Sequence, residues 1–385
     1  MSPSSRSRQK TRLKLDEEYK IISKIGSGGM AEVYKAEQVS LGRLVAIKKL
    51  KSSLTSNPEM LERFFREGRS AANLQHENIV QVYQMGEQDG DHYLVMEYVE
   101  GIDLKSLLKS YGALPWEVAC LIIRQVARGL EFAHQRGYIH RDIKPGNIML
   151  SSRGEVKIMD FGIVRKIDSD LTQTGSFLGT PSYMSPEQLK GEGVSPRSDL
   201  FSLGVMLYEL VSGEKPFKAE NEASLVQKII NEKERPVRKI NPLVPRRVQR
   251  IIKKLMKKNP QQRFSSAGEL VQKLDKLLGE KLISQADQEI ARFLKEAQLS
   301  KDDKTRPLEQ AQPLKPSPKP VRLQKARSKK TKAQKIAQSE EPSEKDWLVK
   351  TFILMAVVLG IILIFYFLNS HGVLDKIINF FKAHF

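Results

Sequence analysis

The fold is decided by the stretch Tyr138-Ile-His-Arg-Asp-Ile-Lys-Pro-Gly-Asn-Ile-Met-Leu150, which continues to Met159-Asp-Phe-Gly162. Within it, the spacing of Asp142, Lys144, Asn147 and Asp160 suits phosphoryl transfer from a magnesium nucleotide. A carboxylate such as Asp142 can accept a hydroxyl proton, and an ammonium such as Lys144 can neutralise a moving phosphate. Asn147 and Asp160 offer hard oxygen atoms, which are the ligands that Mg²⁺ prefers.

Two short apolar runs with strand character follow Asn147. Residues 148–150 and 155–159 have the composition of β-strands, and residues 152–154 that of the turn between them. We expect this hairpin to hold Asn147 and Asp160 on the same side of one metal site.

The run from His140 to Asn147, followed by Asp160-Phe-Gly, resembles the catalytic and metal loops of eukaryotic-like (Hanks-type) Ser/Thr protein kinases. A lone Asp-Phe-Gly arises often by chance, but the two motifs in this order are a strong signal. The resemblance covers roughly residues 19–278. It implies an α+β, two-lobed protein kinase fold with a small β-rich N-lobe and a larger α-helical C-lobe. It also implies ATP with Mg²⁺, or Mn²⁺ in its place.

A glycine-rich turn lies between two expected strands near the start of this region. Gly26 and Gly28 fall on the first two glycines of the kinase phosphate loop, and Ala31 stands at the third. Small residues let backbone N–H groups approach phosphates closely, although a plain hairpin turn is the alternative. By resemblance the nucleotide-binding residues are Ile25, Gly26, Ser27, Gly28, Gly29, Val33, Ala46, Lys48, Met96, Glu97, Val99, Asp103 and Met149.

Lys48 closes an apolar strand, and a buried lysine needs a partner. By resemblance Lys48 contacts the α- and β-phosphates, and Glu67, on a helix expected over residues 58–74, pairs with it. A solvated helix acid is the alternative for Glu67. Met96 matches the gatekeeper, the backbone of residues 97–99 binds the adenine edge, and Asp103 is a candidate contact to the ribose.

The resemblance assigns the remaining site roles. The catalytic set is Asp142, Lys144, Lys48, Glu67, Asn147 and Thr180, and the metal ligands are Asn147 and Asp160. Thr180 matches the threonine that hydrogen-bonds the catalytic aspartate and lysine. Three structural roles are also implied: His140 holds the catalytic loop, Asp199 braces its backbone, and Arg263 pairs with Glu187.

A polar loop between Asp160 and Glu187 resembles a kinase activation segment, with Ser185-Pro-Glu in place of Ala-Pro-Glu. Thr172 and Thr174 fit the paired threonines of bacterial members, and Ser176 is a third candidate for phosphorylation. Simple solvation of the loop is the alternative. Arg141 would offer a guanidinium to a phosphate on this loop. We therefore expect autophosphorylation here.

The formal charge of +19 and the pI of about 9.7 come largely from basic arms. Residues 1–14 carry five Lys or Arg and residues 313–335 carry nine, with no acid in either. Basic arms beside a membrane segment more often reflect topology and anionic lipid than nucleic acid. The one cysteine, Cys120, lies in an apolar helical run at 116–133 and is expected to be buried. Because the first fifteen residues are polar and basic, we expect no signal peptide.

Residues 348–368 form an apolar run whose single charge is Lys350, near one end. About twenty helical residues cross a hydrocarbon core of roughly 30 Å. By the positive-inside rule, the basic stretch before this run is expected to lie on the cytoplasmic side. The expected domains are a flexible basic arm (1–18), a kinase domain (19–279), a disordered Pro/Lys-rich juxtamembrane linker (280–347) with some helix in 280–298, a transmembrane helix (348–368) and a short extracytoplasmic tail (369–385).

The favoured function is a single-pass, membrane-anchored Ser/Thr protein kinase whose catalytic domain faces the cytoplasm. Its expected partners are protein substrates with Ser/Thr acceptors, ATP, membrane lipid and a second copy of the chain as a homodimer, but no nucleic acid. One alternative is a pseudokinase scaffold, although every catalytic position holds a competent residue. A small-molecule kinase of related fold is disfavoured by Ser185-Pro-Glu, Asp199 and Arg263.

Overall fold

The computed structural model describes residues 18–161 and 181–305. Most of the predicted N-terminal arm, most of the predicted activation segment, the linker beyond residue 305, the transmembrane helix and the tail lie outside the described residues. Within the two described ranges, no helix is both long and apolar enough to cross a bilayer.

The small lobe is an antiparallel sheet with one main helix. Its strands run β1 (Tyr19–Ser27), β2 (Ala31–Gln38), β3 (Arg43–Leu50), β4 (Val82–Gln88) and β5 (Asp91–Glu97), and they are ordered β1-β2-β3-β5-β4. A short turn of helix, η1 (Ser52–Leu54), leads to α2 (Pro58–Ala72). Asn57 caps α2 by accepting hydrogen bonds from the N–H groups of Glu59 and Met60, and Pro58 suits the first helical position.

The large lobe is mainly helical and includes a second, three-stranded sheet. Two long, largely buried helices, α4 (Trp116–Gln135) and α6 (Pro196–Ser212), form its core. The other helices are α3 (Leu104–Tyr111), α5 (Pro186–Leu189), α7 (Glu222–Asn231), α8 (Arg246–Leu255), α9 (Ala267–Leu278), α10 (Glu280–Ser284) and α11 (Ala286–Thr305). Short turns are η2 (Pro145–Asn147), η4 (Pro181–Tyr183), η5 (Val237–Lys239) and η6 (Pro260–Gln262).

The second sheet contains the predicted hairpin. Strands β6 (Gly101–Asp103), β7 (Ile148–Ser151) and β8 (Val156–Ile158) pair in that order, with Ile148 opposite Ile158. Gly154 supplies the positive φ of +89° that the turn needs. The prediction of two lobes, a small β-rich N-lobe and a larger helical C-lobe, is confirmed.

The packed body continues past residue 279, where the sequence interpretation ended the kinase domain. Four side chains of α11 are buried in the core of the large lobe: Ala286, Ile290, Phe293 and Leu294. The ring of Phe293 packs edge-on against Tyr111, with centroids 4.9 Å apart. An added Cβ at Gly154 would lie 1.9 Å from the carbonyl oxygen of Asp287, so α11 also sits directly on the β7–β8 turn. Residues 280–298 are therefore a helical part of the large lobe.

Candidate active site

The catalytic loop brings three predicted residues into direct contact. The ammonium of Lys144 lies 2.7 Å from Oδ2 of Asp142. The amide nitrogen of Asn147 donates to the Asp142 carbonyl at 2.8 Å and to its carboxylate at 3.2 Å. Asn147 is buried, and because its NH₂ group donates inside the loop, its amide oxygen is the atom that could act as a cation ligand.

Lys48 joins the two lobes. Its strand, β3, places it opposite Val33 of β2 and Leu94 of β5. The Nζ atom lies 2.6 Å from a carboxylate oxygen of Glu67 on α2 and 2.8 Å from one of Asp160. The expected pairing of Lys48 with Glu67 is therefore present, and the same ammonium also contacts Asp160.

Burial and charge compete in this triad. Burial acts to lower the pKa of Lys48, but the Asp160 and Glu67 carboxylates more than offset it and hold that pKa above its usual range. Burial raises the pKa of Glu67, against the opposing effect of Lys48. For Asp160, the nearby ammonium of Lys48 outweighs burial and lowers the pKa. Asp160 is thus the carboxylate that stays ionised most readily.

Two residues of the site have left-handed backbone conformations that non-glycine residues rarely adopt. Arg141 has a φ of +65° and Asp160 a φ of +50°. Such strain persists only where the surroundings hold it, and it gathers at functional sites. Here the His140 ring supports both loops: its Nε2 is 2.9 Å from the Met159 carbonyl oxygen, and it packs on Phe161 with centroids 4.7 Å apart.

A fully buried carboxylate, Asp199 at the start of α6, anchors the backbone of the catalytic loop. It accepts the backbone N–H of His140 at 2.9 Å and that of Arg141 at 2.8 Å. The Nε2 atom of His134 lies 2.8 Å from the same carboxylate. Although burial acts to raise it, His134 and these hydrogen bonds keep the pKa of Asp199 lowered. From α5, the side chain of Gln188 donates to the Arg141 carbonyl at 2.9 Å.

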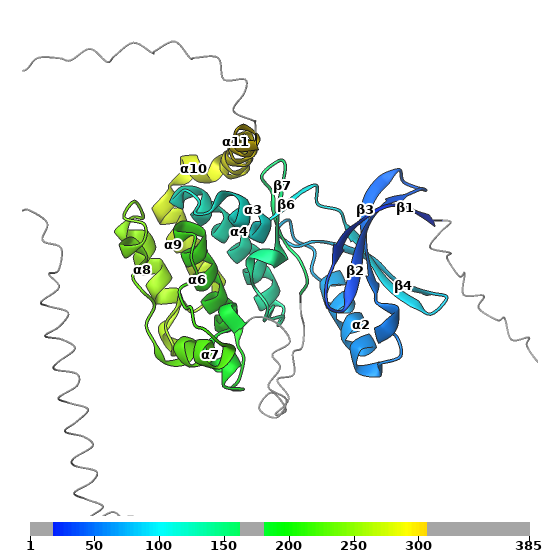
Figure 1. The fold of residues 1–385 in the computed structure, drawn as a ribbon, viewed down its shortest axis with the longest axis horizontal. Helices are drawn as coiled ribbons and strands as arrows, with labels where there is room; N and C mark the ends of the chain where they lie inside the picture. The colour runs from blue at the N-terminus through cyan, green and yellow to red at the C-terminus, as the bar shows by residue number, and fades with distance from the viewer. Residues whose placement is uncertain (1–17, 162–180, 306–385) are drawn as a thin grey trace, which may run out of the picture. The chain divides into compact units, whose positions relative to one another are not determined.

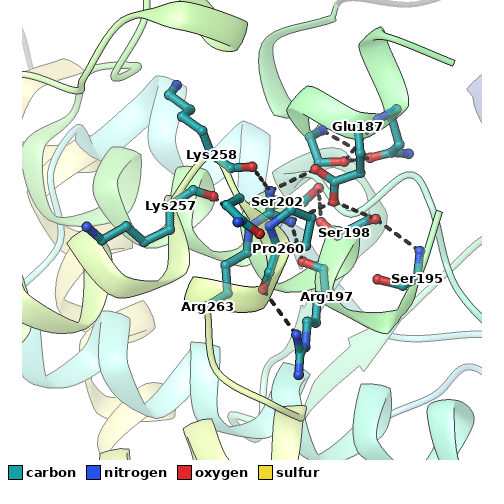
Figure 2. Close-up of polar contacts among 12 residues, drawn as sticks. Glu187, Ser195, Arg197, Ser198, Ser202, Lys257, Lys258, Pro260 and Arg263 are labelled. Carbon is teal, nitrogen blue, oxygen red and sulfur yellow. Dashed lines mark hydrogen bonds and ion pairs between the residues drawn. The ribbon is translucent and has the colours of Figure 1, made fainter. Parts of the chain in front are cut away.

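A buried ion pair links α5 to the residue that follows η6 (Figure 2). Arg263 makes two parallel bonds to Glu187, at 2.6 and 2.8 Å, and both side chains are almost inaccessible. The guanidinium also donates to the carbonyls of Lys257, Lys258 and Arg197. Ser198 donates its hydroxyl to Glu187 at 2.7 Å. The predicted partners are thus in contact, and every N–H direction of the guanidinium is used.

Most of the predicted nucleotide-binding residues lie in β1, β2, β3, β5 and β7. Gly26 pairs with Val33 across β1 and β2, and the N–H of Gly28 donates to the Ala31 carbonyl at 2.8 Å. Ala46 lies opposite Met96. The structure includes the other assigned positions too: Ile25 and Ser27 in β1, Gly29 in the turn, Val99 after β5, and Met149 in β7.

Two of these residues have other engagements. The N–H of Glu97 donates to the Gln81 carbonyl, and its carboxylate pairs with Lys157 at 2.6 Å. The carboxylate of Asp103 caps α3, accepting from the N–H and the hydroxyl of Ser106 at 2.9 and 2.5 Å. Asp103 therefore has a local structural role independent of any ribose contact.

The donor set fits magnesium better than a metal held entirely by protein. Among the described residues, no group of three or more His, Cys, Asp or Glu side chains gathers as a metal site. Mg²⁺ usually takes one or two protein oxygens and completes its shell with water and substrate phosphates. The Asn147 amide oxygen and the Asp160 carboxylate match that pattern.

Other predictions have mixed outcomes. Cys120 is fully buried, as expected. Thr172, Thr174, Ser176 and Thr180 lie outside the described residues.

Sequence reasoning missed His134, Gln188 and Lys157. A histidine on the apolar helix α4 could have drawn attention, whereas nothing local marks Gln188 or Lys157 as partners of the site.

Known proteins resemble the chain over the region described. Residues 19–274 match the protein kinase domain family. A probable serine/threonine-protein kinase of Clostridium perfringens is 44% identical over 264 residues, which cover 68% of this chain and 38% of that protein. PrkC of Bacillus subtilis, a serine/threonine-protein kinase, is 38% identical over 74% of this chain and 45% of its own. PknA of Mycobacterium tuberculosis, another serine/threonine-protein kinase, is 43% identical over 65% of this chain and 59% of its own. The chain therefore spans less than two thirds of the length of these relatives.

Solved structures give the same result for the fold. The kinase domain of Mycobacterium tuberculosis PknI superposes with a TM-score of 0.54 at 28% identity. The match covers 68% of this chain and 96% of that domain.

Proposed function

Because this chain belongs to the protein kinase family, among the Hanks-type Ser/Thr members found in bacteria, we propose that it phosphorylates Ser and Thr hydroxyls of proteins with Mg·ATP. One observation carries this proposal. The Lys48–Glu67 pair, the Lys48–Asp160 contact and the Asp142–Lys144–Asn147 cluster are all formed together. A scaffold that had lost catalysis would have no need to keep all three.

Each residue has a part that follows from its contacts. Asp142, with Lys144 at 2.7 Å, accepts the proton of the acceptor hydroxyl and aims its oxygen at the γ-phosphate. Lys144 and Lys48 offset phosphate charge, and Glu67 positions Lys48. Catalysis then consists of positioning and electrostatic stabilisation, without a covalent enzyme intermediate.

The metal would be held by the amide oxygen of Asn147 and the carboxylate of Asp160. When bound, magnesium supplies positive charge at the nucleotide phosphates. The buried loop contacts of Asn147 and the ammonium of Lys48 beside Asp160 keep both ligands in place. Thr180 is proposed to hydrogen-bond Asp142 and Lys144.

Regulation and location are proposed from the sequence. Autophosphorylation is assigned to Thr172, Thr174 and Ser176, and the segment 348–368 to a single membrane span with the catalytic domain in the cytoplasm. Confinement in a membrane raises the effective concentration of neighbouring copies, which favours phosphorylation between them. Protein substrates would be met from the same side.

The test is the Asp142→Asn variant, which keeps size and hydrogen bonding but removes the base. Transfer of ³²P from ATP to protein should be abolished while nucleotide binding is retained. Phosphosite mass spectrometry of the unaltered chain incubated with Mg·ATP should find modified Ser or Thr. Undiminished transfer in the variant would refute the role of Asp142, and an unmodified wild-type chain that binds ATP would favour the scaffold.

A further inference from the structure

The large lobe carries a long basic segment that the kinase site does not use. From Arg235 to Gly268 the sequence has eleven Lys or Arg and no Asp or Glu. Its most exposed part is the loop before α8 and the outer face of that helix. The side chains there are Lys239, Arg246, Arg247, Arg250 and Lys253. A charged helix face is most often simply solvated, but three observations distinguish this one.

The first is a leucine held out into solvent. Leu243 is 84% exposed, more than any other large hydrophobic side chain among the described residues. Its loop is firmly anchored on both sides. Asn241 donates to the Val211 carbonyl at 2.8 Å and accepts the N–H of Leu243 at 3.1 Å, and the adjacent Val244 is buried. Arg238 also donates to the Val244 carbonyl at 2.9 Å. Leu243 therefore projects from a fixed backbone.

The second observation is the unfavourable position of two arginines. Arg246 and Arg247 occupy the first turn of α8, which has neither an acidic residue nor a capping side chain. Cations at a helix N-terminus oppose the helix dipole, so the fold itself gains nothing from them there. The opposite face of α8 is buried through Val248, Ile252 and neighbouring residues, which fixes the arginines toward solvent.

The third observation is that the arginines of α8 lack ion-pair partners among the described residues. Within the described parts of the chain, none of Arg246, Arg247 or Arg250 forms an ion pair, whereas Lys254 on the same helix pairs with Glu269 at 2.7 Å. Glu234, which is half-buried, lies within electrostatic range of Lys253, Lys257 and Lys258. The arginines at the start of α8 thus keep their charge for an external anion.

We propose that Leu243, Arg246, Arg247 and Arg250, here called the basic ridge, dock on an anionic membrane surface. The arginines bind lipid phosphates, and Leu243 enters the boundary between headgroups and acyl chains. Figure 1 shows α8 in the large lobe, at the side away from β1–β5. The inference goes beyond kinase activity and does not depend on it.

A lipid surface fits better than the other polyanions. Single-stranded nucleic acid is usually held by aromatic stacking, and no aromatic residue occurs between Arg235 and Arg263. Phe264, the next one, is buried. A protruding aliphatic side chain beside phosphate-binding cations serves a bilayer, which offers an anionic surface above an apolar layer.

The experiment places an environment-sensitive nitrobenzoxadiazole label at Leu243→Cys in the full chain. Cys120 does not compete, because it is fully buried and burial raises the pKa of its thiol to about 12. The matched control carries the label at Leu41→Cys, which is 64% exposed in the β2–β3 turn. The probes are vesicles of phosphatidylcholine alone and of phosphatidylcholine mixed with phosphatidylglycerol.

The proposal expects a blue shift at position 243 with the anionic vesicles, reversed by high salt, and none at position 41. It is overturned if position 243 gives no shift with anionic vesicles. It is also overturned if both positions shift equally, or if double-stranded DNA or a polyglutamate peptide produces the shift and vesicles do not.

Charge removal supplies the second readout. In the labelled chain, Arg246→Gln with Arg247→Gln should lower the docking constant about 25-fold, at about fivefold for each arginine near an anionic surface. The control pair Lys20→Gln and Lys109→Gln, also exposed and outside the ridge, should leave it nearly unchanged. Equal losses in both pairs would contradict the proposal. Phosphorylation of a soluble peptide should be the same in all variants, so failure of docking and failure of the kinase assignment are distinguishable.

Discussion

The buried pair between Arg263 and Glu187 should carry a large share of the stability of the large lobe. We consider the variant Arg263→Met, which keeps much of the aliphatic stem and removes the guanidinium. Glu187, whose side chain is only 3% exposed, would lose two bonds and its counter-charge. The carbonyls of Lys257, Lys258 and Arg197 would each lose a donor.

The magnitude follows from burial. Removing one partner of a buried ion pair costs about 3–5 kcal/mol, since the remaining charge is left without compensation. Ser198 still donates to Glu187, which keeps the cost near the middle of that range, about 4 kcal/mol. For a domain of this size, each kcal/mol lowers Tm by roughly 2–4 °C, so Tm should fall by roughly 8–16 °C.

The assay is thermal unfolding followed by circular dichroism. Arg292→Met is the matched control, because Arg292 is 66% exposed and pairs with Glu289 on the surface of α11, where a pair is worth about 1 kcal/mol or less. Adding Glu187→Gln to Arg263→Met removes the stranded charge, so the double variant should lose less than the sum of the single losses. A Tm drop for Arg263→Met no larger than that of the control would refute the reasoning.

Three further outcomes are expected. Lys48→Met should reduce kcat far more than it weakens ATP binding, because Lys48 offsets charge on the phosphates, and comparable losses in both would count against that role. In urea unfolding, Gly154→Ala should destabilise the chain by at least ~1 kcal/mol more than the control Gly137→Ala. Both glycines have a positive φ, but an added Cβ would meet Asp287 only at position 154. Burial acts to raise the pKa of Glu187, but Arg263 holds that pKa below its ordinary 4.5. The stability that the Glu187–Arg263 pair contributes is therefore complete above pH 4.5 and is lost as the pH falls through the folded pKa. The Tm difference between wild type and Glu187→Gln should therefore shrink on acidification below about pH 4.5, and a constant difference would contradict the assignment.

The fold and the contacts of the catalytic loop could be predicted because short-range spacing carries them. Asp142, Lys144 and Asn147 lie within six consecutive residues, and one hairpin connects them to Asp160. Once these motifs are present, a strand lysine and a helix glutamate such as Lys48 and Glu67 become natural partners. Their contact in the structure agrees with that expectation.

The contacts that sequence reasoning missed depend on packing between distant segments. α11 is charged along much of its length, and its few apolar residues gain meaning only against α3, α4 and the β7–β8 turn. The capping role of Asp103 has a local signal in the sequence, since an Asp directly before the first helical residue is a typical N-cap. Gln188 reaches the Arg141 carbonyl across 47 residues of sequence, and no local pattern indicates it.

Asn147 and Asp160 are the residues proposed to hold a divalent ion against the phosphates of a nucleotide. Calorimetry of ATP binding with and without Mg²⁺, on the wild type and on Asp160→Asn, tests this most directly. We predict that Mg²⁺ tightens ATP binding by the wild type and that the variant, which keeps the size of the side chain but loses its charge, shows little of this gain. ATP uptake by the wild type that is indifferent to Mg²⁺, or a gain of equal size in the variant, would contradict the account.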